Sequence, residues 1–206
     1  DIDIFKSEFP NAKNLVFAKP LIRFNKIKAK NDLKKFDKKL LIVGSMDWYP
    51  NINGIEWFAE NVFIPLVKRD PAYKLYLVGR KPDYRIKQLG EKCKNIIVTG
   101  SVDSVDPYYK ECDVSIIPVF EGTGAKIKVL ESLGKGIPTV CSDFAAKDYS
   151  LNNREMLVAP QNAEAFERAI NELEYNLETR MDIYDKMERY MDTYYDINPE
   201  IVKLFE

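Results

Sequence analysis

The sequence contains a glycine-rich segment that leads into two closely spaced lysines. The segment reads FEGTGAKIKVLE over residues 120–131 and follows an apolar run at 114–118. Ile127, Leu130 and Leu133 recur at helical spacing, which predicts that the lysines lie at the start of a helix. The free N–H groups of such a start, the positive end of the helix dipole and two ammonium groups favour an anion. The segment therefore predicts a cradle for a diphosphate.

Known phosphate-binding motifs do not account for this segment. A Walker A loop has Ser or Thr after its lysine, whereas Ile127 follows Lys126. The dinucleotide fingerprint GxGxxG fits Gly122 and Gly124 but needs a third glycine where Ile127 stands. The alternative is an ordinary helix start whose lysines are solvated and pair with a nearby glutamate. The residues alone leave both possibilities open.

Composition narrows the chemistry further. The chain has 206 residues, with 31 Lys and Arg against 32 Asp and Glu, three cysteines and no histidine. The near-zero net charge argues against a nucleic-acid partner. The absence of His excludes Ser-His and Cys-His hydrolase mechanisms. The three cysteines are odd in number and widely spaced, which predicts reduced thiols in a cytoplasmic protein. Because the chain has no His and no CxxC pair, we expect no structural zinc. No apolar stretch reaches the ~18 residues of a membrane span, so we expect a globular protein without a transmembrane helix.

Strand-like and helix-like segments alternate from residue 39 onward. Short runs rich in β-branched residues predict strands at 40–44, 74–78, 96–99, 114–117, 139–141 and, as a sixth, 156–158. Amphipathic stretches predict helices at 53–67, 84–92, 105–111, 126–134 and 163–173, the last continuing with a break near residue 178. This alternation predicts an α/β fold, a Rossmann-like, doubly wound parallel sheet with helices on both faces.

Single residues are expected to shape the helices. Pro65 lacks a backbone N–H and predicts a kink or a division in the helix at 53–67. Asn162 predicts an N-cap for the helix that follows it, and Gly136 a stop after the helix at 126–134.

Residues 1–38 differ from the rest of the chain. Pro10, Pro20 and a Lys/Asn-rich run at 26–39 predict a linker with one short strand at 15–18. The chain starts at Asp1 and not at Met, so we expect a piece of a longer protein. The prediction is therefore one domain at 39–206, preceded by a linker left over from another domain.

Five segments follow one another in a recognisable order along residues 40–165. They read VGSMDWYPN from residue 43, LYLVGRKP from 75, VTGSV from 98, DVSIIPVFEGTGAKIKVLESLGKGIPTV from 113 and MLVAPQNAEAFERAI from 156. In this order they resemble the C-terminal, donor-binding domain of GT-B-fold group 1 glycosyltransferases, particularly those that build bacterial surface polysaccharides. The resemblance implies one Rossmann-like half of a GT-B fold.

The resemblance implies roles for two glutamates. Glu131 would accept hydrogen bonds from the ribose hydroxyls of a sugar nucleotide. Glu121 would lie near the donor sugar as the first acidic residue of the family's pair, although nine residues separate the pair here and the usual spacing is seven. The resemblance thus makes Glu121 one of two implied catalytic residues.

The remaining implied site residues bind the donor. Lys126, the second implied catalytic residue, and Lys128 would hold the diphosphate against the glycine loop. Relatives often place Arg and Lys after the first strand, but this chain has Ser45, Asp47 and Asn51 there, so backbone N–H groups would replace them. The nucleotide base would lie between the loops at 79–82 and 100–102. Besides the two lysines and Glu131, the implied donor-binding residues are Gly44, Ser45, Arg80, Val102, Gly122, Thr123 and Gly124.

The resemblance also implies an activity and partners. The chain would be the sugar-nucleotide-binding half of a retaining glycosyltransferase that moves a sugar from a UDP- or GDP-type donor to a glycan or lipid-linked acceptor, without a metal or other cofactor. The acceptor site would lie on a missing N-terminal domain, through which the cytoplasmic enzyme would contact the inner face of the membrane. Two alternatives remain, a non-catalytic nucleotide-binding or interaction domain and a sugar-nucleotide epimerase of the same architecture.

Four aromatic residues near the first strand are a last candidate. Trp48, Tyr49, Trp57 and Phe58 have rings that could stack on a sugar or a base. Aromatic residues at strand ends and on amphipathic helices more often belong to the core, so we expect core packing for all four.

Overall fold

A six-stranded parallel sheet forms the centre of the molecule. The computed structural model describes residues 8–9, 24–124, 126–149, 151 and 154–195. The strands are β1 (Lys39–Val43), β2 (Lys74–Val78), β3 (Ile96–Gly100), β4 (Val114–Ile117), β5 (Thr139–Ser142) and β6 (Leu157–Ala159). Their order is β3-β2-β1-β4-β5-β6, and all neighbours are parallel. The predicted Rossmann-like sheet is confirmed, with every strand end within one residue of its expected place.

Side chains from both faces of the sheet are buried, which explains why the strands are apolar throughout. On β1, Leu40 and Ile42 belong to the core on one face, and Leu41 belongs to a smaller cluster on the other. All three are at most 5% exposed. Burial on both faces is what a parallel sheet between two layers of helices requires.

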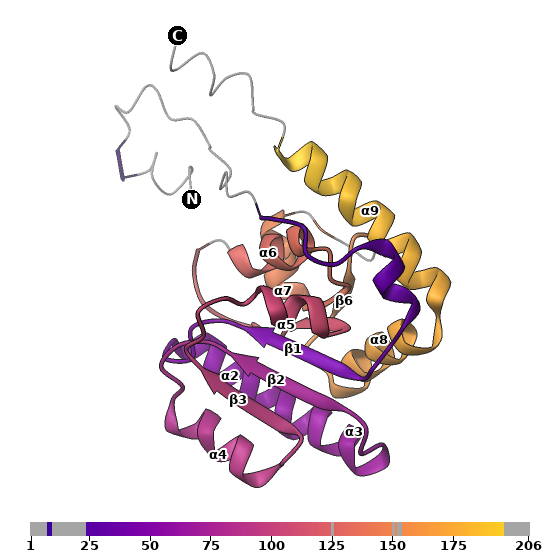
Figure 1. The fold of residues 1–206 in the computed structure, drawn as a ribbon. Coiled ribbons are helices and arrows are strands. Elements are labelled where there is room, and N and C mark those ends of the chain that lie inside the picture. The colour runs from indigo at the N-terminus through magenta and orange to yellow at the C-terminus, as the bar shows by residue number, and fades with distance from the viewer. Residues whose placement is uncertain (1–7, 10–23, 125, 150, 152–153, 196–206) are drawn as a thin grey trace.

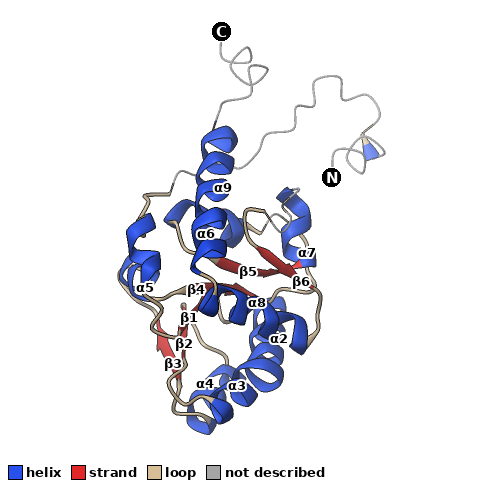
Figure 2. Ribbon diagram, turned by 90° about the vertical axis from the view of Figure 1, so that its right-hand side faces the viewer, coloured by secondary structure: helices blue, strands red, loops and turns tan. Residues whose placement is uncertain are grey.

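The helices form those two layers (Figures 1 and 2). One face carries α2 (Tyr49–Phe58), the π-helical η2 (Ala59–Phe63), α3 (Ile64–Arg69), α4 (Tyr84–Lys92) and α8 (Ala163–Tyr175). The other carries α5 (Asp106–Glu111), α6 (Ile127–Lys135) and α9 (Leu177–Tyr195), with the short α7 (Asp143–Ala146) and η3 (Lys147–Tyr149) following β5.

The predicted helix at 53–67 is longer than expected and contains a π-helical turn. It begins at Tyr49, with Pro50 in the first turn, where a missing N–H costs little. Directly before Pro65, the N–H of Ile64 donates to the carbonyl of Ala59, five residues back. A wider turn relieves the clash between a proline ring and the preceding turn, so the helix runs on to Arg69. The predicted disturbance at Pro65 thus takes the form of a π turn.

The long α8–α9 region breaks at Asn176, two residues before the predicted place. The Asn176 side chain accepts a hydrogen bond from the N–H of Thr179 at 3.1 Å. The buried Arg180 donates to the carbonyls of Leu173 and Glu174 at the end of α8. At the start of α8, the predicted cap is confirmed, since Asn162 accepts from the N–H of Ala165 at 3.0 Å.

Part of the predicted linker lies against the domain. The N–H groups of Ile27 and Lys28 donate to the carbonyl of Lys135 at the end of α6. The buried Lys28 ammonium donates to the carbonyl of Cys112 at 2.6 Å, and Leu33, within η1 (Lys30–Lys34), is 1% exposed. The predicted strand at 15–18 and most of the predicted linker lie outside the described residues.

Two further predictions concern cysteines and membranes. Cys93, Cys112 and Cys141 are all unpaired thiols, as predicted. Within the described residues, no helix combines the length and the apolar character needed to cross a bilayer.

Gly54 sets how closely α2 approaches the loop after β4. A Cβ atom at Gly54 would lie 1.7 Å from the carbonyl oxygen of Pro118. This contact is with backbone, which cannot rotate away, so α2 and the loop would have to separate. Glycine at position 54 therefore allows α2 to pack directly against the loop after β4.

We expect Gly54→Ala to lower the free energy of unfolding by about 1–3 kcal/mol or more, because it overpacks this contact. Gly90→Ala is the matched control within α4, since the nearest atom to its Cβ would be a methyl of Val98 at 3.2 Å, and the nearest backbone atom, the Ile96 carbonyl oxygen, would lie at an ordinary contact distance of 3.5 Å. There the gain in helix propensity, about 1 kcal/mol, offsets the tight contact. Denaturant unfolding of both variants measures the difference. Equal stability of the two variants would show that α2 moves freely relative to the loop.

Candidate functional site

A cavity opens at the carboxyl ends of β1 and β4. These strands are sheet neighbours but not chain neighbours, so the loops that follow them diverge to opposite faces. Ligands of open parallel sheets bind in the crevice at such a switch point. The cavity has a volume of about 340 Å³. Its lining residues are Gly44, Trp48, Asn51, Ile117, Val119, Gly124, Lys126, Ile127, Lys128 and Glu131.

The glycine-rich loop forms the entrance to α6. Gly122 and Gly124 have φ angles of +103° and +79°, a region that favours glycine, so the chain can turn here before the helix starts. Helix α6 begins at Ile127 and ends at Gly136, whose φ of +81° gives the predicted left-handed stop. No side chain caps the N-terminus of α6. The first residues of α6, Ile127 and Lys128, line the cavity, so the N-terminus of the helix lies beside it.

The Lys128 side chain extends over Gly44 in the loop that follows β1. A Cβ atom at Gly44 would lie only 2.2 Å from Cε of Lys128, so the absence of a side chain at Gly44 makes room for the lysine. The Lys128 ammonium lies 6.0 Å from the ring centre of Trp48. Burial lowers the pKa of Lys128, opposed by the charge of Glu131. A partly desolvated ammonium of this kind is stabilised by a bound anion.

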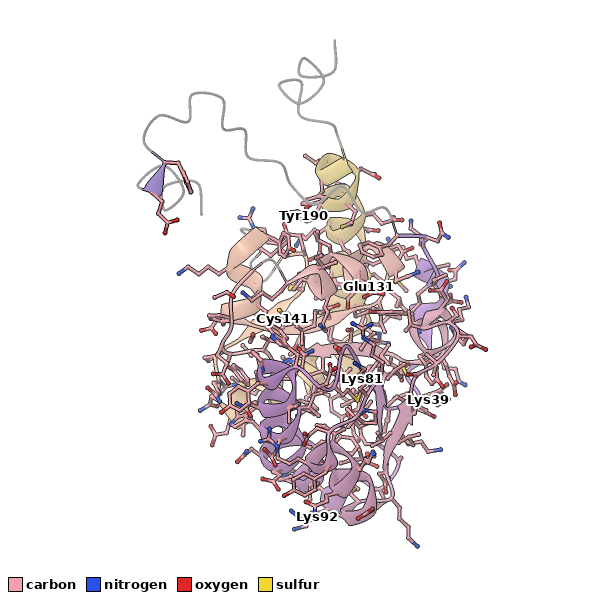
Figure 3. All side chains as sticks on the ribbon, turned by 90° about the vertical axis from the view of Figure 1, so that its left-hand side faces the viewer. Lys39, Lys81, Lys92, Glu131, Cys141 and Tyr190 are labelled. Carbon is pink, nitrogen blue, oxygen red and sulfur yellow. The ribbon has the colours of Figure 1, made fainter. Side chains whose placement is uncertain are left out.

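Glu131 lies one turn further along α6 and also lines the cavity. Figure 3 places it near the middle of the molecule, well away from Lys92 at the end of α4. Burial raises the pKa of Glu131, and the positive charges of Lys135 and Lys128 oppose this rise. The carboxylate is therefore held beside a lysine in a partly dry pocket, where hydrogen bonds to it are strong.

Lys126 is the second lysine of the cavity. It is 9% exposed, and its ammonium lies 4.5 Å from the ring centre of Phe144. The structure thus brings Gly44, Gly124, Lys126, Lys128 and Glu131 together in one cavity, as their implied roles require.

Ser45 and Arg80 lie beside the cavity without lining it. The guanidinium of Arg80 donates to the Ser45 hydroxyl at 3.4 Å, and the N–H of Met46 donates to the Arg80 carbonyl at 3.1 Å. A Cβ atom at Gly79 would lie 1.7 Å from the carbonyl oxygen of Gly44, so the loops after β1 and β2 are in direct contact. The loops after β1 and β2 therefore form a continuous edge beside the cavity.

The other predicted site residues lie further from the cavity. Glu121 is exposed and accepts a hydrogen bond from the Asn53 side chain at 2.6 Å. Gly122 and Thr123 are exposed in the glycine loop, outside the lining. Val102 follows β3 and packs against a separate small cluster on the α5 side of the sheet. Their predicted contacts with a donor stay predictions.

The core prediction for the four aromatic residues is half wrong. Phe58 is fully buried, and Trp57 packs edge-on against Phe120 at 4.8 Å between ring centres. Trp48 and Tyr49, however, are 39% and 61% exposed, and Trp48 lines the cavity. Trp48 is the residue that precedes α2, so it lies off the apolar face of that helix.

Asn51 is a second cavity residue absent from the predicted set. It is 4% exposed, and its side-chain amide donates to the carbonyl of Ser45 at 2.7 Å. A buried amide that holds the loop after β1 is the kind of residue that shapes a site. Its place in the first turn of α2, directly after Pro50, is the signal that could have found it.

The described residues contain no group of three or more His, Cys, Asp or Glu side chains arranged to hold a metal ion.

The doubly wound parallel sheet, with a cavity lined by two lysines at its switch point, defines a Rossmann-like α/β domain. Residues 37–176 match the sequence profile of the family described as "Glycosyl transferases group 1". This match covers more than half of the chain, and the chain belongs to the group 1 glycosyltransferases. The predicted family and the predicted GT-B type of domain are both confirmed.

Individual relatives agree with this assignment. The chain is 21% identical over 185 residues to an uncharacterised 44.6 kDa protein in the cps region of Klebsiella pneumoniae, a match over 84% of this chain and 48% of that protein. It is similar in structure to TarM of S. aureus, with a TM-score of 0.74, 16% identity and coverage of 95% of this chain and 39% of TarM. It is also similar to Anabaena HepE in complex with UDP, with a TM-score of 0.67, 14% identity and coverage of 86% and 53%. The chain spans about half the length of the curated relative that it matches.

Proposed function

We propose that this chain is the donor-binding half of a retaining glycosyltransferase that takes a sugar from a UDP- or GDP-sugar. The observation that carries the proposal is the convergence of Lys126, Lys128 and Glu131 on one cavity at the switch point of the sheet. Two ammonium groups and a helix N-terminus suit a diphosphate, and a carboxylate one turn further suits the hydroxyls of a ribose.

The same arrangement suits the departure of the diphosphate from the sugar. As the bond between the anomeric carbon and the phosphate oxygen breaks, negative charge grows on the diphosphate. Lys126 and Lys128 line the cavity in which this charge would lie, and α6 begins beside it, so these groups would stabilise the transition state. Departure of the diphosphate would therefore need no bound metal. Glu121 is expected to lie near the donor sugar.

Ligands in the crystal structures of two relatives support the proposed class of donor and of acceptor. HepE and TarM have been crystallised with UDP, and TarM also with α-GlcNAc-glycerol. We propose that this chain uses a donor of the same class and, together with an N-terminal domain, passes a hexose to a glycan or lipid-linked acceptor. A cytoplasmic enzyme that contacts the membrane through that second domain would fit such an acceptor.

Replacement of Glu131 by Gln tests the proposal. Loss of the charge weakens hydrogen bonds from the ribose hydroxyls by about 1.5–3 kcal/mol, which is a factor of roughly 10 to 150 in Kd. Calorimetry with UDP and GDP measures the change, and Glu91→Gln on the exposed side of α4 is the matched control. If Glu131→Gln binds both nucleotides as tightly as the unchanged chain does, Glu131 does not belong to the site.

A further inference from the structure

One face of α2 packs along residues 118–122, the loop that leads from β4 toward α6. The residues of this face are three or four positions apart, so they lie on one side of the helix: Pro50, Asn53, Gly54 and Trp57. Gly54 lies against the carbonyl of Pro118, and Trp57 packs edge-on against Phe120 at 4.8 Å between ring centres. The helix therefore holds this loop over most of its length.

The start of the glycine-rich loop belongs to the same contact. A Cβ atom at Gly122 would lie 3.1 Å from Cγ of Pro50 and 3.2 Å from the ring of Trp48, so this glycine packs closely on the start of α2. Asn53 is the polar residue of the helix face, and its side-chain amide donates to Oε1 of Glu121 at 2.6 Å. The helix thus holds both Glu121 and the glycine that follows it.

A second helix fixes the orientation of the Asn53 amide. The guanidinium of Arg85, in the first turn of α4, donates to Oδ1 of Asn53 at 3.4 Å. A guanidinium can only donate, so the oxygen of the amide faces Arg85 and its NH₂ group faces Glu121. Arg85 is itself held by the carboxylates of Glu56 at 3.2 Å and Asp83 at 3.5 Å. The order of donors and acceptors therefore runs from α4 through α2 to the loop.

We propose that Asn53 is a positioning residue, which holds the Glu121 carboxylate in place for its contact with the donor sugar. This inference rests on the proposed function, which puts Glu121 near that sugar. An exposed glutamate beside a glycine with a φ of +103° would otherwise lose conformational freedom when it binds a ligand, and the bond to Asn53 reduces that loss before binding. The carboxylate keeps further acceptor positions for a sugar hydroxyl, because Asn53 occupies only one of them.

The test measures the ratio of the Kd of a sugar nucleotide to the Kd of the nucleoside diphosphate with the same base. The probe is whichever of UDP-glucose, UDP-N-acetylglucosamine and GDP-mannose the unchanged chain binds most tightly in calorimetry. Asn53→Ala should raise the ratio about fivefold, the effect of one ordinary hydrogen bond, and leave the Kd of UDP or GDP unchanged. Asn53→Asp should raise it about tenfold or more, because a second carboxylate would face Glu121 and repel it.

A double-mutant comparison separates positioning from a general structural role. In a chain that already carries Glu121→Ala, Asn53→Ala should have no further effect on the ratio, because Asn53 acts only through that carboxylate. The matched control is Asn61→Ala in η2, which removes another surface amide, one that donates to the carbonyl of Trp57 at 2.8 Å. The control should leave the ratio unchanged. Thermal unfolding should show that both single variants fold as the unchanged chain does.

The possible failures are distinguishable. An unchanged ratio in Asn53→Ala, or an equal rise with and without Glu121, would show that Asn53 does not position this carboxylate, and the proposed function would still stand. If the unchanged chain binds none of the three sugar nucleotides, the proposed function and the role of Asn53 are both wrong.

Discussion

A chain with Lys126→Ala and Lys128→Ala is expected to lose at least about a hundredfold in affinity for UDP or GDP, while it binds the bare nucleoside as the unchanged chain does. Each charge-assisted contact is worth about 1.5–3 kcal/mol, and two such contacts reach about a hundredfold or more in Kd. The selectivity of the loss follows from the position of both lysines at the start of α6, one turn before Glu131. Calorimetry with nucleoside, UDP and GDP measures it.

A matched control separates site charge from net charge. Lys74→Ala with Lys94→Ala also removes two positive charges, but both residues are exposed and lie at the amino-terminal ends of β2 and β3, away from the cavity. That variant should bind UDP almost normally, because exposed charges far from a ligand are screened.

A chelator should leave binding to the unchanged chain intact. If EDTA abolishes it, a metal bridges the diphosphate, and Asp47 and Glu121 become its candidate ligands.

The sheet could be predicted almost completely from the sequence. Parallel strands buried on both faces are continuous apolar runs, so Val114–Ile117 and Thr139–Ser142 stand out from the amphipathic segments around them. The interior of the helical run at residues 49–69 could not be predicted in the same way. The π turn at Ala59–Phe63 accommodates Pro65 without ending the helix. Whether a helix continues past a proline depends on the tertiary contacts of the segments before and after it, and the local sequence does not contain that information.

The cavity could be predicted only in part. Lys126 directly precedes α6 and Lys128 lies in its first turn, so the sequence pattern groups the two lysines, whereas Glu131 joins them only through the family resemblance. Trp48 and Asn51 come from the opposite wall, and only the approach of α2 to the loop after β4 brings them there. The sequence pattern predicts a core position for Trp48, because its sequence neighbours are typical of a core residue. In the structure Trp48 directly precedes α2 and lies on the wall of the cavity.

We expect this chain alone to transfer no sugar at a useful rate. Transfer needs an acceptor held within a few ångströms of the anomeric carbon, and most of the rate gain from such positioning is lost when one partner diffuses freely. The lining of the cavity comes from the end of β4, the loops after β1 and β4, the first turn of α2, and α6. The chain also spans only 39% of TarM and 53% of HepE, so a second wall is expected from the rest of the protein.

The measurement compares this chain with the longer protein of which it would form part, both incubated with UDP- and GDP-sugars and candidate acceptors. Slow hydrolysis of the donor should survive in the short chain, because Lys126, Lys128 and the α6 N-terminus still stabilise the departing diphosphate. That residual hydrolysis should disappear in Lys126→Ala with Lys128→Ala, which ties it to the cavity and not to a contaminant. Multiple turnovers of sugar transfer by the short chain, at the rate of the longer protein, would mean that one domain holds both donor and acceptor and that the cavity is larger in its working state than the space between β1 and β4.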